Sequence, residues 1–179
     1  MRHAGKRGKP ARMRRPSEHT VAALSVLAAG VALGIALAAQ HLGGMVPCAL
    51  CLLERWPYRI AIVLSLAACF LPAVLARVSL ALVALVMLAG AGLGALHVGV
   101  EQGWWPSPLP ECAAPPIATG SIAARLATMP ARPSKPCDAP TYLIPHLPVS
   151  MAAMNLIFAL AFAVLLAIFL WRAGLGGRA

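Results

Sequence analysis

Four long runs of apolar residues dominate this chain, and the first of them, from Val21 to Ala39, contains no charged residue. A helix needs about 20 apolar residues to cross the hydrocarbon core of a bilayer. The runs at about 60–76, 78–100 and 149–171 come close to that length. The chain of 179 residues is 60% hydrophobic and 11% charged, with mean hydropathy +0.80, which is too apolar for a soluble domain of this size. The sequence therefore predicts an all-α membrane protein, a four-helix transmembrane bundle.

The same runs divide the chain into one membrane domain and two tails. A basic tail occupies residues 1–19, the membrane domain covers 20–171, and a short tail follows at 172–179. Two longer connections between the runs lie at 40–59 and 101–148. An even number of spans places both tails on the same side of the membrane.

The second and third runs meet at Arg77, which is the only charged residue between them. A turn this short predicts an antiparallel hairpin. Pro72 then falls inside the second span, where a bundle tolerates a proline and the helix can kink. Gly90, Gly92 and Gly94 in the third run are small enough to allow close contact with another helix.

The distribution of basic residues predicts which side the tails occupy. Ten of the fifteen lysines and arginines lie in the two tails and the short turn, against five in the two longer connections. Cytoplasmic segments carry the excess of Lys and Arg, so both termini are predicted to be cytoplasmic and the two longer connections to be periplasmic loops. Seven of the basic residues lie within the first fifteen positions, directly before an apolar run. We therefore interpret the net charge of +10 as a topology signal and expect no nucleic-acid partner.

A basic tail before an apolar run is also typical of a secretory signal peptide, with Ala36-Leu37-Ala38 as a cleavage site. The run is longer than the usual apolar core of a signal peptide and further spans follow, so we expect it to be kept as the first span. Arg14-Arg15 as a twin-arginine export signal is a weaker alternative.

Two pairs of cysteines fall in the connections assigned to the outer side. Cys48 and Cys51 form a Cys-x-x-Cys pair just before the second run, whereas Cys112 and Cys137 lie in the second connection. The outside of a cytoplasmic membrane is an oxidising compartment in which disulfides form. Because they are neighbours along the chain, Cys48 is expected to pair with Cys51, and Cys112 with Cys137. Cys69 is left alone within a span, as a small buried apolar residue.

The spacing of the first pair indicates reactivity. A disulfide at this spacing closes a very small ring and gains little loop entropy, so it is expected to be reactive and not structural. If the chain is helical from Leu50 onward, Cys51 lies in the first turn, where the helix dipole lowers the pKa of a thiol. Arg55 follows one turn later and can favour the thiolate further. The second pair would close a loop of about 26 residues and stabilise the fold by roughly 3.5 kcal/mol, and thiol exchange can pass electrons between two such pairs.

Other interpretations of the cysteines compete with a redox role. Two outer pairs could bind zinc, but the second pair is not itself Cys-x-x-Cys and the compartment favours oxidation, so no metal is expected. Covalent haem attachment needs a histidine directly after Cys-x-x-Cys, where this chain has Leu52, so no haem is expected. The alternative from another functional class is a non-catalytic membrane scaffold with two structural disulfides.

The neighbours of the first pair have functional and structural interpretations. For Arg55 we favour a role at the redox site, whereas a belt of interfacial side chains accounts for Trp56, Tyr58 and Arg59. Glu54 is expected to pair locally. His97 is ionisable at membrane depth and is therefore a candidate for the cofactor site, but Gly94 nearby also fits a histidine that hydrogen-bonds a close helix.

Within the second outer connection, the apolar residues Ile122, Leu126 and Met129 recur at i, i+4 and i+7. This pattern would suit a short helix lying flat on the membrane surface. Nine residues are few enough that a coincidence accounts for the pattern nearly as well.

At the cysteines and their neighbours the sequence resembles the disulfide bond formation protein B (DsbB) family, the quinone-linked oxidases of the bacterial cytoplasmic membrane. The resemblance covers most of the chain, from the first run to the fourth. It rests on Pro47-Cys48-Ala49-Leu50-Cys51 with Glu54-Arg55, on Gly103-Trp104-Trp105-Pro106-Ser107-Pro108 leading to Cys112, and on Cys137-Asp138 before the last run. The four-span quinone reductases that act on vitamin K share the chemistry, but their Cys-x-x-Cys lies late in the bundle.

The resemblance implies an electron relay. A reduced periplasmic DsbA-like oxidase would attack the residue matching Cys112 to form a mixed disulfide, with Cys137 as the second member of that pair. Electrons would pass to the first pair, in which Cys48 exchanges with the loop pair and Cys51 faces a quinone, ubiquinone or menaquinone, that Arg55 supports. No role carries over to His97.

On this basis the chain is expected to be a protein-dithiol:quinone oxidoreductase that supports disulfide bond formation. Its active site would face the periplasm from the bacterial inner membrane. The expected partners are the DsbA-like oxidase, the membrane quinone pool and the lipid bilayer.

Overall fold

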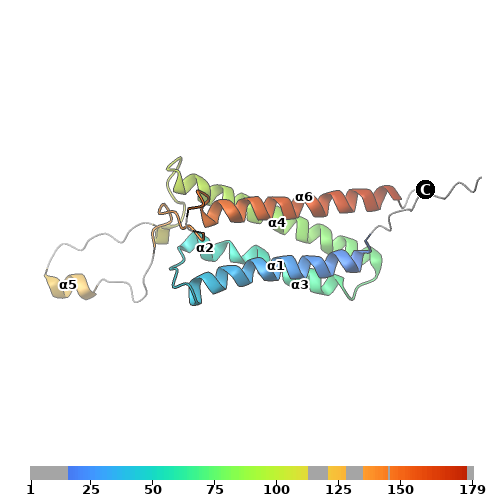
Figure 1. Cartoon of the computed structure of the whole chain (residues 1–179), viewed down its shortest axis with the longest axis horizontal. Helices are drawn as coiled ribbons and strands as arrows, with labels where there is room; N and C mark the ends of the chain where they lie inside the picture. The colour runs from blue at the N-terminus through green and yellow to red at the C-terminus, as the bar shows by residue number, and fades with distance from the viewer. Residues whose placement is uncertain (1–15, 113–120, 128–134, 145, 177–179) are drawn as a thin grey trace, which may run out of the picture.

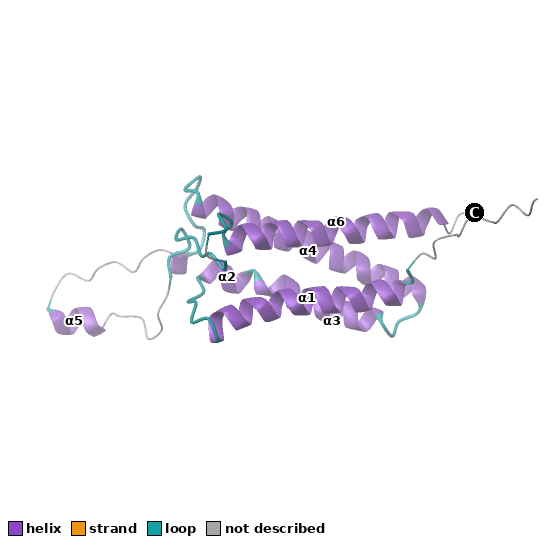
Figure 2. Ribbon diagram, viewed as in Figure 1, coloured by secondary structure: helices purple, strands orange, loops and turns teal. Residues whose placement is uncertain are grey.

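A computed structural model describes residues 16–112, 121–127, 135–144 and 146–176 of the chain. Figure 2 shows that these residues form helices and loops, with no strand among them. Four long helices lie side by side as a bundle (Figure 1): α1 (Glu18–His41), α3 (Arg55–Ala68), α4 (Ala73–Glu101) and α6 (Met151–Gly176). The short helices are α2 (Ala49–Leu53), η1 (Pro110–Cys112) and α5 (Ile122–Ala127). The expected all-α class is confirmed.

Three of the long helices, α1, α4 and α6, are long and apolar enough to cross a membrane. The helix α3 has only 14 residues. It is separate from α2 because Pro57 has no backbone N–H to donate to the carbonyl of Leu53, so a continuous helix would lose that hydrogen bond. Glu54 stands at the break and caps both helices.

The turn between α3 and α4 lies at residues 69–72, and not at Arg77 as the apolar pattern indicated. Pro72 is the N-cap of α4 and causes no kink within a span, because proline cannot donate the N–H of a continuing helix and also restricts the residue before it. Arg77 is helical and binds the carboxylate of Glu18 at 2.6 Å, which ties α4 to the start of α1. Cys69 caps the end of α3, so it lies at this turn and not within a span as expected.

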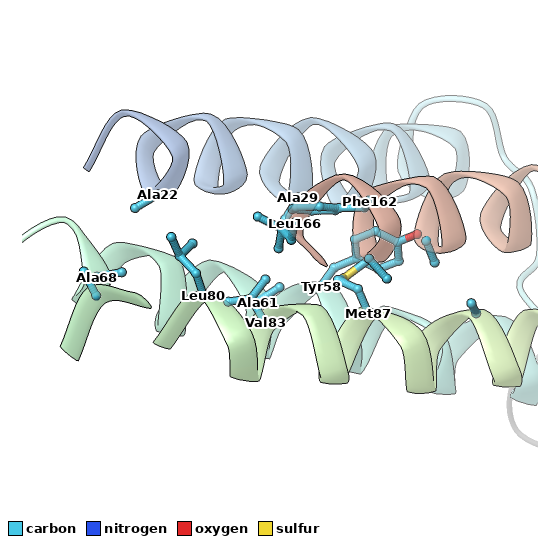
Figure 3. Packing of buried hydrophobic residues seen from close by; sticks show 14 residues of the cluster. Ala22, Ala29, Tyr58, Ala61, Ala68, Leu80, Val83, Met87, Phe162 and Leu166 are labelled. Carbon is cyan, nitrogen blue, oxygen red and sulfur yellow. The ribbon is translucent and has the colours of Figure 1, made fainter. Parts of the chain in front are cut away.

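Small side chains fill much of the centre of the bundle. Figure 3 shows this cluster, in which alanines from several helices meet larger apolar side chains. The buried alanines labelled there are Ala22, Ala29, Ala61 and Ala68. Such small residues let helices approach each other closely where no hydrophobic effect drives them together.

Two of the three glycines noted in α4 lie at close helix contacts. A Cβ atom on Gly94 would stand 3.0 Å from the Cα of Leu156 in α6, and one on Gly90 would stand 3.0 Å from the Cβ of Pro57 in α3. A Cβ atom on Gly92 would meet nothing within 4 Å. The expectation of close packing is therefore correct for Gly90 and Gly94 and wrong for Gly92.

The two ends of the bundle differ. At one end, Figure 1 places α2, the loops and the start of α6, and at the other it places the α3–α4 turn and the end of α6. The helix α5 stands apart from the bundle on the loop side. It confirms a helix at Ile122, whose side chain is exposed like that of Leu126, whereas Met129 lies outside the described residues.

Candidate active site

The Cys-x-x-Cys pair is held by the first turn of α2. Cys48 is the N-cap residue in an extended conformation, and its Sγ accepts a hydrogen bond from the backbone N–H of Cys51 at 3.2 Å. The two sulfur atoms are 2.8 Å apart and neither cysteine is in a disulfide. Cys51 lies in the first helical turn, as the sequence predicted.

The pKa values of the two thiols are shifted in opposite directions. The hydrogen bond that they share lowers the pKa of Cys48 and raises the pKa of Cys51, and burial raises the pKa of Cys51 further. The expectation that the pKa of Cys51 is lowered is therefore wrong for this dithiol form. The reason is that Cys48, as the cap, accepts the hydrogen bonds that stabilise a thiolate.

A buried carboxylate and a buried imidazole lie beside Cys48. His97 of α4 is 2% exposed, its Nδ1 is 2.9 Å from Oε1 of Glu54, and its Nε2 is 3.5 Å from Sγ of Cys48. Glu54 is also buried. The expectation that Glu54 pairs locally is wrong, since its partner lies 43 residues along the chain. Packing of α4 against the α2–α3 junction brings the two together.

A cavity of about 210 Å³ opens between α1, α3 and α6 next to Cys51. Most of its walls are apolar side chains of α1 and α6, such as Ile35 and Phe158. Its polar lining comes from five residues: Cys51, Glu54, Arg55, Tyr58 and Asn155. Neither Cys48 nor His97 lines this cavity. The structure therefore places His97 against Cys48 and not in the wall of this cavity, and its assignment to a cofactor site stays a prediction.

Hydrogen bonds across the bundle orient the polar groups of the cavity. Arg55 is buried, and its Nη1 donates to Oε1 of Gln40 at the end of α1, at 2.6 Å. The hydroxyl of Tyr58 donates to Oδ1 of Asn155 in α6, at 2.5 Å. Tyr58 is only 6% exposed, so the interpretation of this residue as part of an interfacial belt is wrong.

Trp56 and Arg59 have different surroundings from Tyr58. Trp56 is exposed, and the guanidinium of Arg59 lies 5.1 Å from the centre of its ring. A cation over an exposed aromatic ring is compatible with the interfacial belt expected for these two side chains.

The second cysteine pair forms a disulfide between Cys112 at the end of η1 and Cys137, which is the expected pairing. Both cysteines of this disulfide are buried in one apolar cluster with Cys48, Leu50 and Val100. Cys51 packs against the edge of the same cluster and also lines the cavity, so Cys48 is the member of the first pair that is buried together with the loop disulfide.

The segment that leads to Cys112 is hydrogen-bonded to the end of α4. Gly103, with φ +70°, ends the helix, and the N–H of Trp104 donates to the carbonyl of Gly99 at 2.9 Å. The indole N–H of Trp105 donates to the carbonyl of Leu96 at 3.1 Å. A Cβ atom on Gly99 would lie 2.0 Å from the Trp105 ring, so glycine is needed there for the tryptophan to dock.

Comparison with known proteins agrees with this arrangement. The family model described as "Disulfide bond formation protein DsbB" matches residues 18–169, which is most of the chain. The chain belongs to the DsbB family. A relative named Disulfide bond formation protein B, from Herminiimonas arsenicoxydans, is 34% identical over 93 residues, which are 52% of this chain and 56% of that protein. The match thus spans little more than half the length of that relative. No solved structure matches the chain.

Membership of the DsbB family agrees with the three membrane-length helices. Together they make this chain a multi-pass inner-membrane protein.

Two cysteines and a histidine of this DsbB-family site lie close enough together to hold a metal ion. The ligand atoms of Cys48, Cys51 and His97 lie within 4.8 Å of one another. Three donors of this kind suit zinc, but the same atoms form the hydrogen bonds described above. The expectation of no metal stays a prediction.

Two polar residues of this DsbB-family site were not predicted from the sequence. Gln40 follows directly after the first apolar run, and Asn155 is the one polar residue between Met151 and Trp171. A polar side chain in an otherwise apolar span is by itself a signal of function. That signal could have singled out Asn155, but not its partner, Tyr58.

Proposed function

We propose that this chain is a membrane thiol:quinone oxidoreductase. It reoxidises a periplasmic DsbA-like dithiol oxidase and passes the electrons through two cysteine pairs to a membrane quinone. One observation carries the proposal: Cys48 shares a buried cluster with the loop disulfide, whereas Cys51 lines an apolar cavity that also contains a cation. The Cys-x-x-Cys pair therefore stands between an electron entrance and an electron exit.

The first part of the relay uses thiol exchange. A thiolate of the partner oxidase attacks Sγ of Cys112, which breaks the disulfide and releases Cys137 as a thiolate. Cys137 then attacks Cys48 of an oxidised first pair, which breaks that disulfide and releases Cys51. The second thiolate of the partner then attacks the mixed disulfide and frees Cys112, which attacks Cys137, re-forms the loop disulfide and leaves Cys48 and Cys51 as a dithiol. Each attack forms one S–S bond and breaks another, so no electrons are lost. Packing of Cys112, Cys137 and Cys48 in one cluster supports the second attack because little movement is needed.

The second part takes place at the cavity. A quinone accepts two electrons and two protons, and it can reach the site from within the membrane. The residues present fit such a group, because apolar walls suit its ring and the polar groups gather at the end near Cys51. Arg55 would hold a carbonyl oxygen and stabilise negative charge there, and Gln40 keeps its guanidinium in place.

The proposed topology has four crossings, α1, α3, α4 and α6, with both termini in the cytoplasm. The basic residues of the tails support it, and so does the gathering of α2 and the loops at one end of the bundle (Figure 1). Membrane-impermeant maleimide applied to intact spheroplasts should label Leu42→Cys and spare Phe70→Cys, both in a Cys69→Ala background. Both positions are exposed, so equal labelling would contradict this topology.

The deciding experiment mixes the purified protein with a reduced dithiol substrate and a soluble quinone and follows quinone absorbance. Quinone should be reduced by the unmodified protein and by Cys69→Ala, but not by Cys48→Ser or Cys51→Ser. Both serine variants should fold, since a Cys-x-x-Cys ring adds little stability. A scaffold with structural disulfides would reduce no quinone in any variant.

A further inference from the structure

We propose that Glu54 and His97 form a proton relay that carries the proton of the Cys48 thiol to the cavity. The inference rests on the proposed function and concerns how the reaction at the cavity is completed. It assigns a task to two buried ionisable side chains that electron transfer through the cysteines does not use.

The three groups form a continuous chain of contacts. Sγ of Cys48 is 3.5 Å from Nε2 of His97, and Nδ1 of the same ring is 2.9 Å from Oε1 of Glu54. Glu54 in turn lines the cavity together with Cys51. An imidazole can accept a proton on one nitrogen and release another from the other nitrogen. The chain therefore begins at the thiol that is remote from the cavity and ends at the cavity wall.

The balance of the reaction requires such a path. Oxidation of the two thiols breaks two S–H bonds, forms the Cys48–Cys51 disulfide, and delivers two electrons and two protons to the quinone, which becomes a quinol. Cys51 lines the cavity and can deliver its own proton there. Cys48 is 4% exposed and does not line the cavity. The Cys51 sulfur, 2.8 Å away, becomes bonded to Cys48 in the reaction, which leaves the imidazole of His97 as the group that accepts the proton.

The relay assigns each transfer to one atom. His97 takes the proton from Cys48 at Nε2 as the Cys48–Cys51 bond forms and the two electrons pass to the quinone, and it releases the proton on Nδ1 to Glu54. Glu54 then passes a proton into the cavity, to the oxygen that becomes a quinol hydroxyl. Afterwards Glu54 is a carboxylate again and His97 is neutral with its proton on Nε2, so the imidazole must return to the tautomer with the proton on Nδ1 before the next turnover.

The competing explanation is a structural ion pair that only fastens α4 to the α2–α3 junction. Breaking a buried pair by removing one partner is costly in either case, so loss of activity in a variant with a large substitution would not decide the matter. Glu54→Gln does decide it, because an amide oxygen can still accept the hydrogen bond from His97 but cannot carry a proton.

The experiment measures two steps separately in the purified full-length protein. The first is formation of the mixed disulfide between Cys112 and a reduced thioredoxin-like dithiol protein. The second is reduction of a soluble ubiquinone analogue after the dithiol has been supplied. General acid–base catalysis typically contributes 10²- to 10⁴-fold, so Glu54→Gln and His97→Gln should slow the second step by about 100-fold or more and leave the first step unchanged.

Chemical rescue and matched controls complete the test. Added imidazole should restore part of the second step in His97→Ala but not in Glu54→Gln. The controls are His41→Gln on the loop side of the bundle and Glu18→Gln, which breaks the ion pair with Arg77 at the other end. Both should reduce quinone at the rate of the unmodified protein.

Two results would overturn the relay. Quinone reduction at an unchanged rate in Glu54→Gln and His97→Gln would leave the proposed function standing without it. Equal slowing of both steps together with a lowered melting temperature would reduce the pair to a structural contact. If the unmodified protein reduces no quinone, the proposed function itself fails and the relay fails with it.

Discussion

Cys48 and Cys51 are only three residues apart, but they have different neighbours. Cys48 is buried with the loop disulfide and lies against His97, whereas Cys51 packs against the edge of that cluster and also lines the cavity with Arg55. The thiol hydrogen bond gives them different acidities as well. Position in the first turn of a five-residue helix is enough to separate their tasks.

The acidity difference predicts the order in which the reduced thiols are alkylated. The pKa of Cys48 is lowered, so this residue becomes a thiolate at a lower pH than Cys51 and should react first with iodoacetamide as pH rises. Peptide mass spectrometry of samples quenched across a pH series measures both onsets. Cys51→Ala removes the hydrogen bond and should move the onset of Cys48 alkylation to higher pH. An earlier onset for Cys51 would contradict the assignment.

Arg55 supports a second prediction at the residue scale. Removing a hydrogen bond to a charged group costs about 1.5–3 kcal/mol, so Arg55→Ala should raise the KM for quinone by roughly tenfold or more. Arg55→Lys should recover only part of the loss, because an ammonium has no planar fork of donors. Arg59→Ala is the control, since Arg59 lies over the exposed Trp56 ring. Steady-state kinetics at varied quinone decide the matter, and an unchanged KM in Arg55→Ala would make it a structural residue only.

Among the elements, α4 does most to assemble the site. Its Gly94 lies against the backbone of α6, its His97 reaches the α2–α3 junction, and its last turn receives Trp105. One rigid helix therefore sets the distance between the cavity wall in α6 and the cysteine pair. A shift of α4 would move several of these contacts together.

Two glycines of α4 test whether its close packing against α6 stabilises the bundle. Gly94→Ala would place a methyl group 3.0 Å from the Cα of Leu156, and overpacking of this kind typically costs about 1–3 kcal/mol. Gly92→Ala is the matched control, because its methyl group meets nothing within 4 Å and alanine is the better helix former by about 1 kcal/mol. Unfolding by SDS in mixed micelles measures both free energies. A loss in Gly92→Ala as large as in Gly94→Ala would contradict the packing described for α4.

On the scale of the whole molecule, a membrane bundle is joined to a loop that carries its own disulfide. The loop is connected to the bundle through Cys112, which follows the docked Trp105, and through the cluster around Cys48. Under the proposed function, electrons that enter at this loop would reach a cavity between membrane helices without a mobile carrier.

This arrangement predicts a trapped intermediate. In Cys137→Ser, the Cys112 thiolate can attack the disulfide of an oxidised DsbA-like partner, and the thiol that would displace the partner from Cys112 is missing, so the adduct should persist. Non-reducing electrophoresis should show this adduct, and reductant should remove it. Cys69→Ala is the control and should accumulate none. Absence of the adduct in Cys137→Ser would favour a structural role for the loop disulfide.

The sequence alone determined the all-helical class, the two cysteine pairs and the family resemblance, because run length, spacing and motif are local properties of a chain. It also contained the signal for the α3–α4 turn, since Pro72 cannot continue a helix, but the apolar pattern favoured Arg77 as the boundary. Hydropathy does not distinguish a turn from a span when the turn residues are themselves apolar.

Only the tertiary structure decided which polar groups meet. Glu54 and His97 are 43 residues apart, and Tyr58 and Asn155 are 97 apart. Nothing in the spacing of such residues pairs them, because each contact depends on how close two helices pack and on which faces they turn toward each other. In the apolar interior of a membrane bundle a polar group needs a partner, and the glycines and alanines that let the helices approach determine which partner it meets.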